Sequence, residues 1–158
     1  TMRTKIWNIL DELWIKYTNF EHEKVRSTLD SKWVDVPWLR AKSLLIRNKK
    51  ATNFYMVVVH EGKKLDTNIV RDIFDDSKMS FFEEELMVEK IWLRPWSVSP
   101  FALINNTIKD IKVVFDNTLK DNLVWFHPLQ NDNTVVLKME DVEKFLNHLW
   151  FEYVFVEL

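Results

Sequence analysis

The sequence of 158 residues contains no cysteine and only one glycine. Without cysteine the chain has no disulfides, no thiolate nucleophile and no cysteine-ligated zinc or iron–sulfur centre. A single glycine cannot build a glycine-rich phosphate loop, which argues against kinase, GTPase and dinucleotide-binding functions. Turns that need a positive φ must therefore use residues that carry a Cβ, for which left-handed backbone is costly.

Long apolar runs are also lacking, and none approaches the roughly 18 residues that a membrane span needs. The N-terminus does not follow the basic-then-apolar plan of a signal peptide, so we expect a cytoplasmic protein without membrane contact. The four histidines are too scattered for a helical metal site, and we expect no metal and no cofactor. Because the net charge is −2, we expect any RNA contact to be local.

The order of apolar patterns predicts a single α+β domain over residues 1–158. Helical spacing predicts helices over 5–14, after Asp66, after Ser80 and from Glu140. Asp66 can cap the second helix, and Ser80 with Glu83 forms a capping box for the third. A short strand within 15–22 is expected to precede a polar helical connector. Runs rich in β-branched and aromatic residues predict the remaining strands, at 41–47, 54–59, 111–116, 122–128, 134–139 and 152–158, with the first two forming a hairpin.

Three segments carry a family resemblance: AKSLLIR at 41–47, PWSVSPFALINN at 95–106 and FHPLQNDNTVVL at 126–137. In this order they resemble the YbaK/ProX family of aminoacyl-tRNA deacylases, and the resemblance covers nearly the whole chain. It implies a mixed, largely antiparallel β-sheet or partly closed barrel flanked by helices. It also implies a trans-editing hydrolase that removes a wrongly attached amino acid from tRNA. The second and third segments are more similar to the ProX branch, which implies alanine on proline tRNA as the substrate.

The resemblance also implies a site built from all three segments. Lys42, at the pocket edge, and His127 take the catalytic positions. The backbone of the second segment would polarise the ester carbonyl, and no general base stands in a recognisable position that would make its serines nucleophiles. The implied partner is the acceptor end of mischarged tRNA, with prolyl-tRNA synthetase as a further candidate. The implied substrate-binding residues are Ser43, Trp96, Ser97, Val98, Ser99, Pro100, Phe101, Asn131 and Thr134.

Taken by themselves, several of these residues also have simpler explanations. Lys42 could be a surface lysine on an edge strand, since most lysines are exposed, and His127 a half-buried structural histidine. Asn131 and Thr134 could form a turn before the next strand. A group of basic residues around the predicted hairpin could form a rim for the acceptor stem or a solvated surface: Arg47, Lys49, Lys50, Lys63 and Lys64.

Six of the eight tryptophans occupy places where the family commonly carries glycine: positions 14, 33, 38, 92, 96 and 150. Trp14 and Trp150 follow predicted helices, where glycine normally forms the left-handed cap, so we expect a cost on the order of 1 kcal/mol at each. This pattern suggests an altered or designed sequence. Trp96 stands in the site loop, where glycine would let the backbone approach the substrate.

Three alternative functions stay open beside deacylation of alanyl-tRNA for proline. The chain could be a cysteinyl-tRNA deacylase, or an editing domain that belongs to a larger prolyl-tRNA synthetase. It could also be a catalytically impaired tRNA-binding or interaction module, and Trp96 favours that reading.

Overall fold

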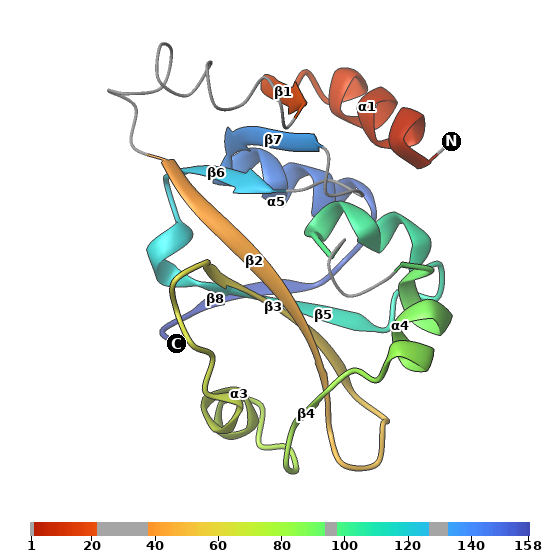
Figure 1. Ribbon diagram of the computed structural model, residues 1–158, viewed down its shortest axis with the longest axis vertical. Helices are drawn as coiled ribbons and strands as arrows, with labels where there is room; N and C mark the ends of the chain where they lie inside the picture. The colour runs from red at the N-terminus through yellow and green to blue at the C-terminus, as the bar shows by residue number, and fades with distance from the viewer. Residues whose placement is uncertain (1, 22–37, 94–97, 127–132) are drawn as a thin grey trace.

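A mixed eight-stranded sheet organises the computed structural model, which describes residues 2–21, 38–93, 98–126 and 133–158 (Figure 1). The helices are α1 (Met2–Glu12), α3 (Thr67–Ile73), α4 (Glu84–Ile91) and α5 (Met139–His148), with 3₁₀ turns η2 (Pro100–Asn105) and η3 (Asn117–Leu119). The strands are β1 (Tyr17–Glu21), β2 (Trp38–Arg47), β3 (Phe54–His60), β4 (Ser80–Phe81), β5 (Ile111–Asp116), β6 (Leu123–Phe126), β7 (Asn133–Lys138) and β8 (Tyr153–Val156).

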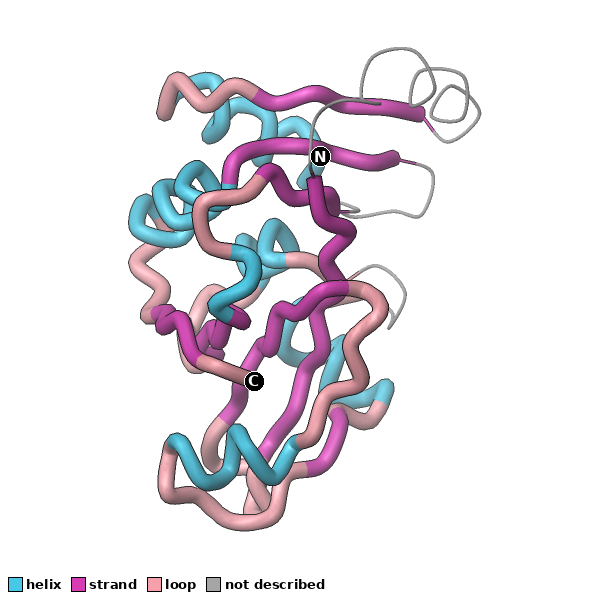
Figure 2. The backbone as a smooth tube through the Cα atoms, turned by 90° about the vertical axis from the view of Figure 1, so that its left-hand side faces the viewer, coloured by secondary structure: helices cyan, strands magenta, loops and turns pink. Residues whose placement is uncertain are grey.

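Strand β2 is shared by the two halves of the sheet. The strand order is β1-β7-β6-β2-β3-β5-β8, with β4 pairing on β2. Residues 38–40 of β2 pair in parallel with β6, whereas residues 41–47 pair antiparallel with β3. Figure 1 shows β2 crossing the molecule diagonally between these two groups of strands, and Figure 2 shows the same arrangement from the side. One long strand therefore connects both parts of the sheet.

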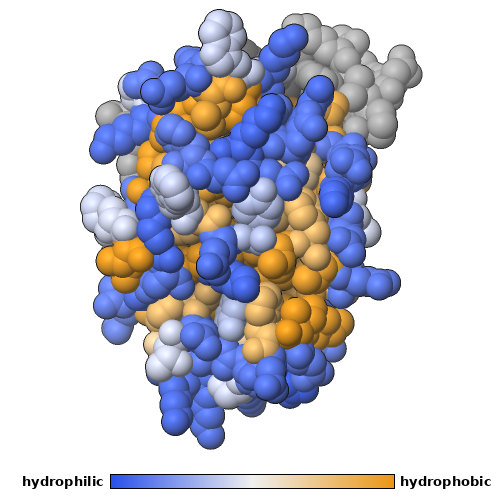
Figure 3. All heavy atoms as spheres, turned by 180° about the vertical axis from the view of Figure 1, so that it is seen from behind, coloured by the Kyte–Doolittle hydropathy of each residue, from blue (hydrophilic) through white to orange (hydrophobic). Residues whose placement is uncertain are grey.

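Two apolar clusters cover the opposite faces of this sheet. The main core takes Leu45, Val58 and Phe115 from the strands, together with residues of α1, α4, η2 and α5. The second cluster lies on the other face, where Val57 and Val114 pack with residues of α3. Side chains of a strand alternate between faces, so neighbouring residues of β2 and β3 belong to different clusters. Figure 3 shows hydrophilic side chains over much of the back of the molecule, with apolar areas between them.

Most of the expected elements are confirmed. The predicted hairpin is present as the antiparallel pair β2 and β3, and Asp66 caps α3 by accepting a hydrogen bond from the Asn68 N–H. The mixed sheet flanked by helices is confirmed as well. Among the described strands, four pairings are antiparallel and three parallel, and the sheet stays open because β1 and β8 end it on either side. The predicted connector within 27–34 lies outside the described residues.

The predicted capping box of Ser80 and Glu83 is wrong. Ser80 belongs to β4 and pairs with Arg47 of β2, so α4 begins only at Glu84. Glu83 is the N-cap residue, and its side chain forms an ion pair with Arg47 in place of a cap. The pairing with β2 therefore overrides the local capping signal. Within the described ranges, no helix has the length and apolar character needed to cross a bilayer.

Candidate functional site

The second motif forms the 3₁₀ turn η2, which is fixed in the main core. Ser99 is the N-cap residue, Pro100 follows at the first position, and both are buried. The Phe101 ring is fully buried and packs edge-on against Phe126, at 6.1 Å between centroids, and against Phe145 of α5, at 5.1 Å. Proline fixes its own φ, and the buried ring anchors the turn. The backbone of the turn Pro100–Asn105 is therefore anchored in the main core.

A polar network ties η2 to the end of α4. The buried Asn105 side chain donates to the Ile91 carbonyl at 2.9 Å. Asn106 donates to the Lys90 carbonyl at 3.2 Å and to an Asp110 carboxylate oxygen at 2.9 Å. Lys90 completes the network by an ion pair with Asp110. The last carbonyls of a helix have no intrahelical partners, so these asparagines satisfy them. The asparagines thus join two elements, a role that turn propensity alone could not identify.

The first motif lies on β2, and its two polar residues point to opposite faces. Lys42 pairs with Val59, which belongs to the second cluster, and Ser43 pairs with Val58, which lies in the main core. Lys42 is partly exposed. Ser43 is only 9% exposed, and its hydroxyl has no hydrogen-bond partner among the described residues. Ser43 therefore faces the side of the sheet on which Phe101 is packed.

Strand β6 brings the three motifs together. It lies beside the strand that carries Lys42, because Trp125 pairs with Arg40 and the Arg40 guanidinium stacks 3.7 Å from the centre of the indole ring. The next residue, Phe126, opens the third motif and contacts Phe101 of the second. Three segments far apart in the sequence therefore meet around the end of β6.

The structure describes only some of the remaining predicted site residues. Trp96, Ser97, His127 and Asn131 lie outside the described residues. Thr134 belongs to β7, where its backbone pairs with Phe20 of β1. Val98 is partly buried and packs against the main core. The described part of the site thus consists of β2, the turn η2 and the end of β6.

The basic residues around the hairpin do not form a continuous rim. Arg47 donates two hydrogen bonds to Glu83, one of them over 3.2 Å. This hydrogen bonding lowers the pKa of Glu83 to about 2. Lys63 pairs at 2.9 Å with Asp116, whose side chain is almost completely buried. Two of the five predicted cations are therefore neutralised by carboxylates, whereas Lys49, Lys50 and Lys64 are exposed.

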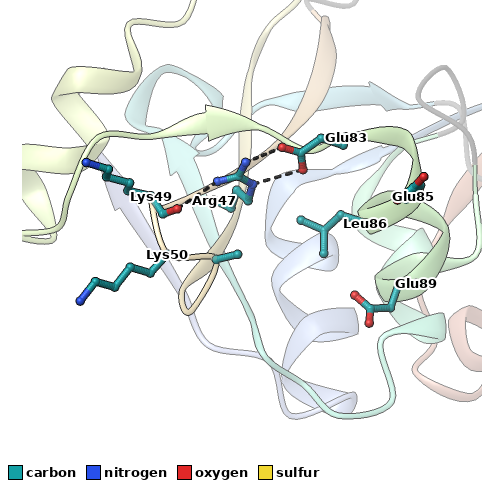
Figure 4. Close-up of a pocket in the computed structure, with 8 residues that line it drawn as sticks. Arg47, Lys49, Lys50, Glu83, Glu85, Leu86 and Glu89 are labelled. Carbon is teal, nitrogen blue, oxygen red and sulfur yellow. Dashed lines mark hydrogen bonds and ion pairs between the residues drawn. The ribbon is translucent and has the colours of Figure 1, made fainter.

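A surface hollow of about 570 Å³ lies between the hairpin tip and α4 (Figure 4). Lys49 and Lys50 line it on the hairpin side, while Glu85 and Glu89 line it on the helix side. It begins at Arg47, five residues along β2 from Lys42, which corresponds to roughly 16 Å of extended chain. Its mixed charge does not favour a polyanion, and it lies at the far end of the first motif, away from Lys42 and Ser43. Among the described residues, no group of three or more His, Cys, Asp or Glu side chains is arranged to hold a metal ion.

Comparison with known proteins identifies the class. The sequence profile of the aminoacyl-tRNA editing domain matches residues 35–145, and the chain belongs to this family. The prolyl-tRNA editing protein ProX of Acetoanaerobium sticklandii is 35% identical over 138 residues, which cover 85% of this chain and 84% of that protein. The prolyl-tRNA synthetase associated domain-containing protein 1 of Mus musculus is 25% identical over 148 residues, 89% of this chain and 86% of the relative. The resemblance in the three motifs is thereby confirmed.

Solved structures confirm the fold. A protein provisionally named as a trans-editing enzyme for prolyl tRNA synthetase superposes with a TM-score of 0.68 at 12% identity, over 99% of this chain and 97% of that one. The hypothetical protein APE2540 gives a TM-score of 0.66 at 14% identity, over 94% and 96% of the two chains. At such low identity the agreement concerns the arrangement of helices and strands alone.

Proposed function

We propose that this chain is a trans-editing hydrolase that removes the amino acid from mischarged tRNA, with alanyl-tRNA for proline as its substrate. The observation that carries the proposal is the meeting of the three motifs around β6, through the contacts of Phe101 with Phe126 and of Arg40 with Trp125. Membership of the editing family and the 35% identity to ProX support it. Prolyl-tRNA synthetase, which charges the same tRNA, is the proposed partner.

The reaction is the hydrolysis of an ester. Water attacks the carbonyl carbon of the aminoacyl group, the bond from that carbon to the ribose oxygen breaks, and the ribose oxygen takes up a proton. Catalysis of such a step needs positioning of the ester and donors aimed at the developing oxyanion. Backbone N–H groups that precede Pro100, which has no N–H of its own, are suited to this task, because Phe101 and Asn105 hold the adjoining turn in place.

The polar residues of β2 take different roles in this proposal. Lys42 lies on the face opposite the main core and supplies a positive charge for a phosphate or the terminal adenosine. The buried Ser43 hydroxyl, which has no partner within the described part of the chain, hydrogen-bonds the aminoacyl group on the side of η2. His127, Asn131 and Thr134 complete the substrate contacts, with Trp96, Ser97 and Val98 in the loop that holds the ester.

The first experiment measures release of amino acid from alanyl-, cysteinyl- and prolyl-tRNA for proline. We expect alanine to be released and proline to be retained. Lys42→Ala should lower kcat/KM by roughly 10-fold to 100-fold, because a hydrogen bond to a charged group contributes about 1.5–3 kcal/mol. Lys144→Ala is the matched control, since Lys144 is an exposed lysine of α5. Preferred release of cysteine would instead identify a cysteinyl-tRNA deacylase.

Absence of release above the buffer rate from all three substrates would refute the hydrolase proposal for the chain as it stands. The variant Trp96→Gly then separates a blocked site from a binding module. Activity that appears only in this variant identifies the indole as the obstruction. Binding of uncharged tRNA without hydrolysis in either form would support the interaction module.

A second experiment uses Ser43→Ala, for which stability and activity should change in opposite directions. Removing a buried hydroxyl to which no described residue hydrogen-bonds should leave the free energy of unfolding unchanged or raise it by about 1 kcal/mol. The same change should lower deacylation, because the substrate loses a hydrogen-bond partner. If Ser43→Ala destabilises the protein and leaves kcat/KM unaltered, the hydroxyl has a structural role and does not contact the substrate.

A further inference from the structure

Three helices end on a tryptophan with left-handed backbone. Trp14 after α1 has a φ of 59°, Trp92 after α4 a φ of 60°, and Trp150 after α5 a φ of 64°. These values lie in the region that residues with a Cβ rarely adopt and that glycine adopts freely. The same unusual combination of residue and conformation therefore occurs at three separate places in the fold.

The hydrogen bonds at these ends are those of glycine caps. Trp14 donates to the Asp11 carbonyl and Ile15 to the Leu10 carbonyl, the two bonds of a Schellman motif, and Ile15 and Leu10 are both buried. Trp92 makes the single bond of the simpler left-handed motif, from its N–H to the Val88 carbonyl. Both motifs place glycine most often at the position that tryptophan holds here.

The end of α5 repeats the Schellman motif. Trp150 donates to the Asn147 carbonyl, and Phe151 donates to the Leu146 carbonyl. Phe151 and Leu146 are buried in the main core, which supplies the apolar contact that accompanies the motif. The chain direction after α5 thus depends on the left-handed residue at 150.

These three side chains are largely exposed and contribute little packing that could offset the strained backbone. The exposed fractions are 92% for Trp14, 62% for Trp92 and 84% for Trp150. By contrast, Trp7 stacks on Tyr17 with ring centroids 5.0 Å apart. Trp125 is 7% exposed and lies under the Arg40 guanidinium. The five tryptophans whose side chains the structure describes are therefore of two kinds, packed ones and ones exposed at a helix end.

The remaining described α-helix has a different residue at its left-handed end. After α3 the left-handed residue is Asp75, with a φ of 49°, and Asp is one of the few residues that tolerate this conformation. The one glycine of the chain, Gly62, is not in a left-handed conformation. Independent drift from glycine would have produced varied replacements. Tryptophan occupies all three sites, and one shared cause would explain this: the way in which the codon at these positions is read.

We propose that the protein carries glycine at positions 14, 92 and 150 when its own cell makes it. The codon at these positions would be one that this cell reads as glycine and that another translation system reads as tryptophan. UGA is the candidate codon, since it differs by one base from the glycine codon GGA and by one base from the tryptophan codon UGG. Trp7 and Trp125 remain tryptophan. By extension the site loop carries glycine at position 96, a consequence that rests on the proposed function.

Peptide mass spectrometry of the protein purified from its source cells tests the inference directly. We expect glycine at positions 14, 92 and 150, together with tryptophan at positions 7 and 125 in the same sample. Tryptophan at the three helix ends would overturn the inference, whatever the outcome of the deacylation assays. This measurement does not depend on tRNA or on activity.

The second test compares thermal unfolding of the chain that has tryptophan at positions 14, 92 and 150 with that of a triple glycine variant. The variant carrying Trp14→Gly, Trp92→Gly and Trp150→Gly should have a Tm higher by roughly 2–4 °C for each relieved position. Trp7→Gly is the control, and it should lower the Tm because it removes the stack on Tyr17 and places glycine inside α1. A Tm of the triple variant that is unchanged or lower would contradict the inference.

Discussion

Replacing Phe101 by alanine tests whether the motif turn η2 is anchored in the core. The Phe101 ring is fully buried and contacts Phe126 and Phe145 edge-on. Phe→Ala changes at buried positions cost about 3–5 kcal/mol, because transfer free energy is lost and a cavity remains. The aromatic pairs add to the loss, so we expect a value in the upper half of this range. That is a large share of a stability of roughly 5–15 kcal/mol.

Urea unfolding, followed by fluorescence, measures this loss. With an m-value of about 2 kcal/mol per molar urea, the midpoint should fall by roughly 2 M. Phe101→Leu retains most of the volume and should cost less than about 1.5 kcal/mol. Phe81→Ala is the matched control, because Phe81 is 54% exposed in β4 and should cost less than about 1 kcal/mol. Equal losses for Phe101→Ala and Phe81→Ala would refute the anchoring of η2.

Two further predictions concern buried charge and pH. Lys63→Met should destabilise the protein by about 3–5 kcal/mol in chemical denaturation, because it leaves the buried Asp116 carboxylate without its cation. Lys64→Met is the control, since it changes an exposed lysine and should have almost no effect on stability. Partial burial raises the pKa of Asp76, but hydrogen bonds, among them one from Tyr55, outweigh it and lower the pKa from 3.8 to about 2. The stabilisation by the Asp76 carboxylate is present above its unfolded pKa and is lost as the pH falls through its folded pKa. We therefore measure the free energy of unfolding from pH 5 to pH 2. Asp76→Asn should lose less stability over this range than the unmodified chain. A parallel pH dependence of the two proteins would contradict the assignment.

Local pattern was sufficient for most elements of this fold. The apolar spacing of α1, α3 and α5 and the β-branched runs of β2 and β3 each identify a buried face without knowledge of what covers it. The capping box at Ser80 failed for a non-local reason, since Ser80 pairs with Arg47, more than thirty residues away. Pairing across such a distance competes with the local signal and leaves no trace within the segment itself.

The candidate site divides in the same way. Motif order identified the family and the segments that carry Lys42, Phe101 and His127, because those residues are contiguous with recognisable neighbours. Alternation along a strand already places Lys42 and Ser43 on opposite faces, but the register between β2 and β3 was needed to show that Ser43 is the one facing the main core. The ion pairs of Arg47 and Lys63 likewise depend on where β4 and β5 lie relative to the hairpin. Of the two interpretations that the sequence left open for these cations, the rim for the acceptor stem is therefore weakened by carboxylate partners that the sequence does not place.

Glycine scarcity is the feature that sequence and structure explain together. The sequence by itself determined that glycine is almost absent and that helices end near residues 14 and 150, because composition and periodicity are local properties. The family resemblance added that tryptophan stands where relatives commonly carry glycine. The tertiary structure decided that positions 14, 92 and 150 need a positive φ and leave their side chains exposed. Backbone dihedral angles at a helix end are set by the direction in which the following chain must leave to reach the core, and that direction is fixed only by the assembled fold.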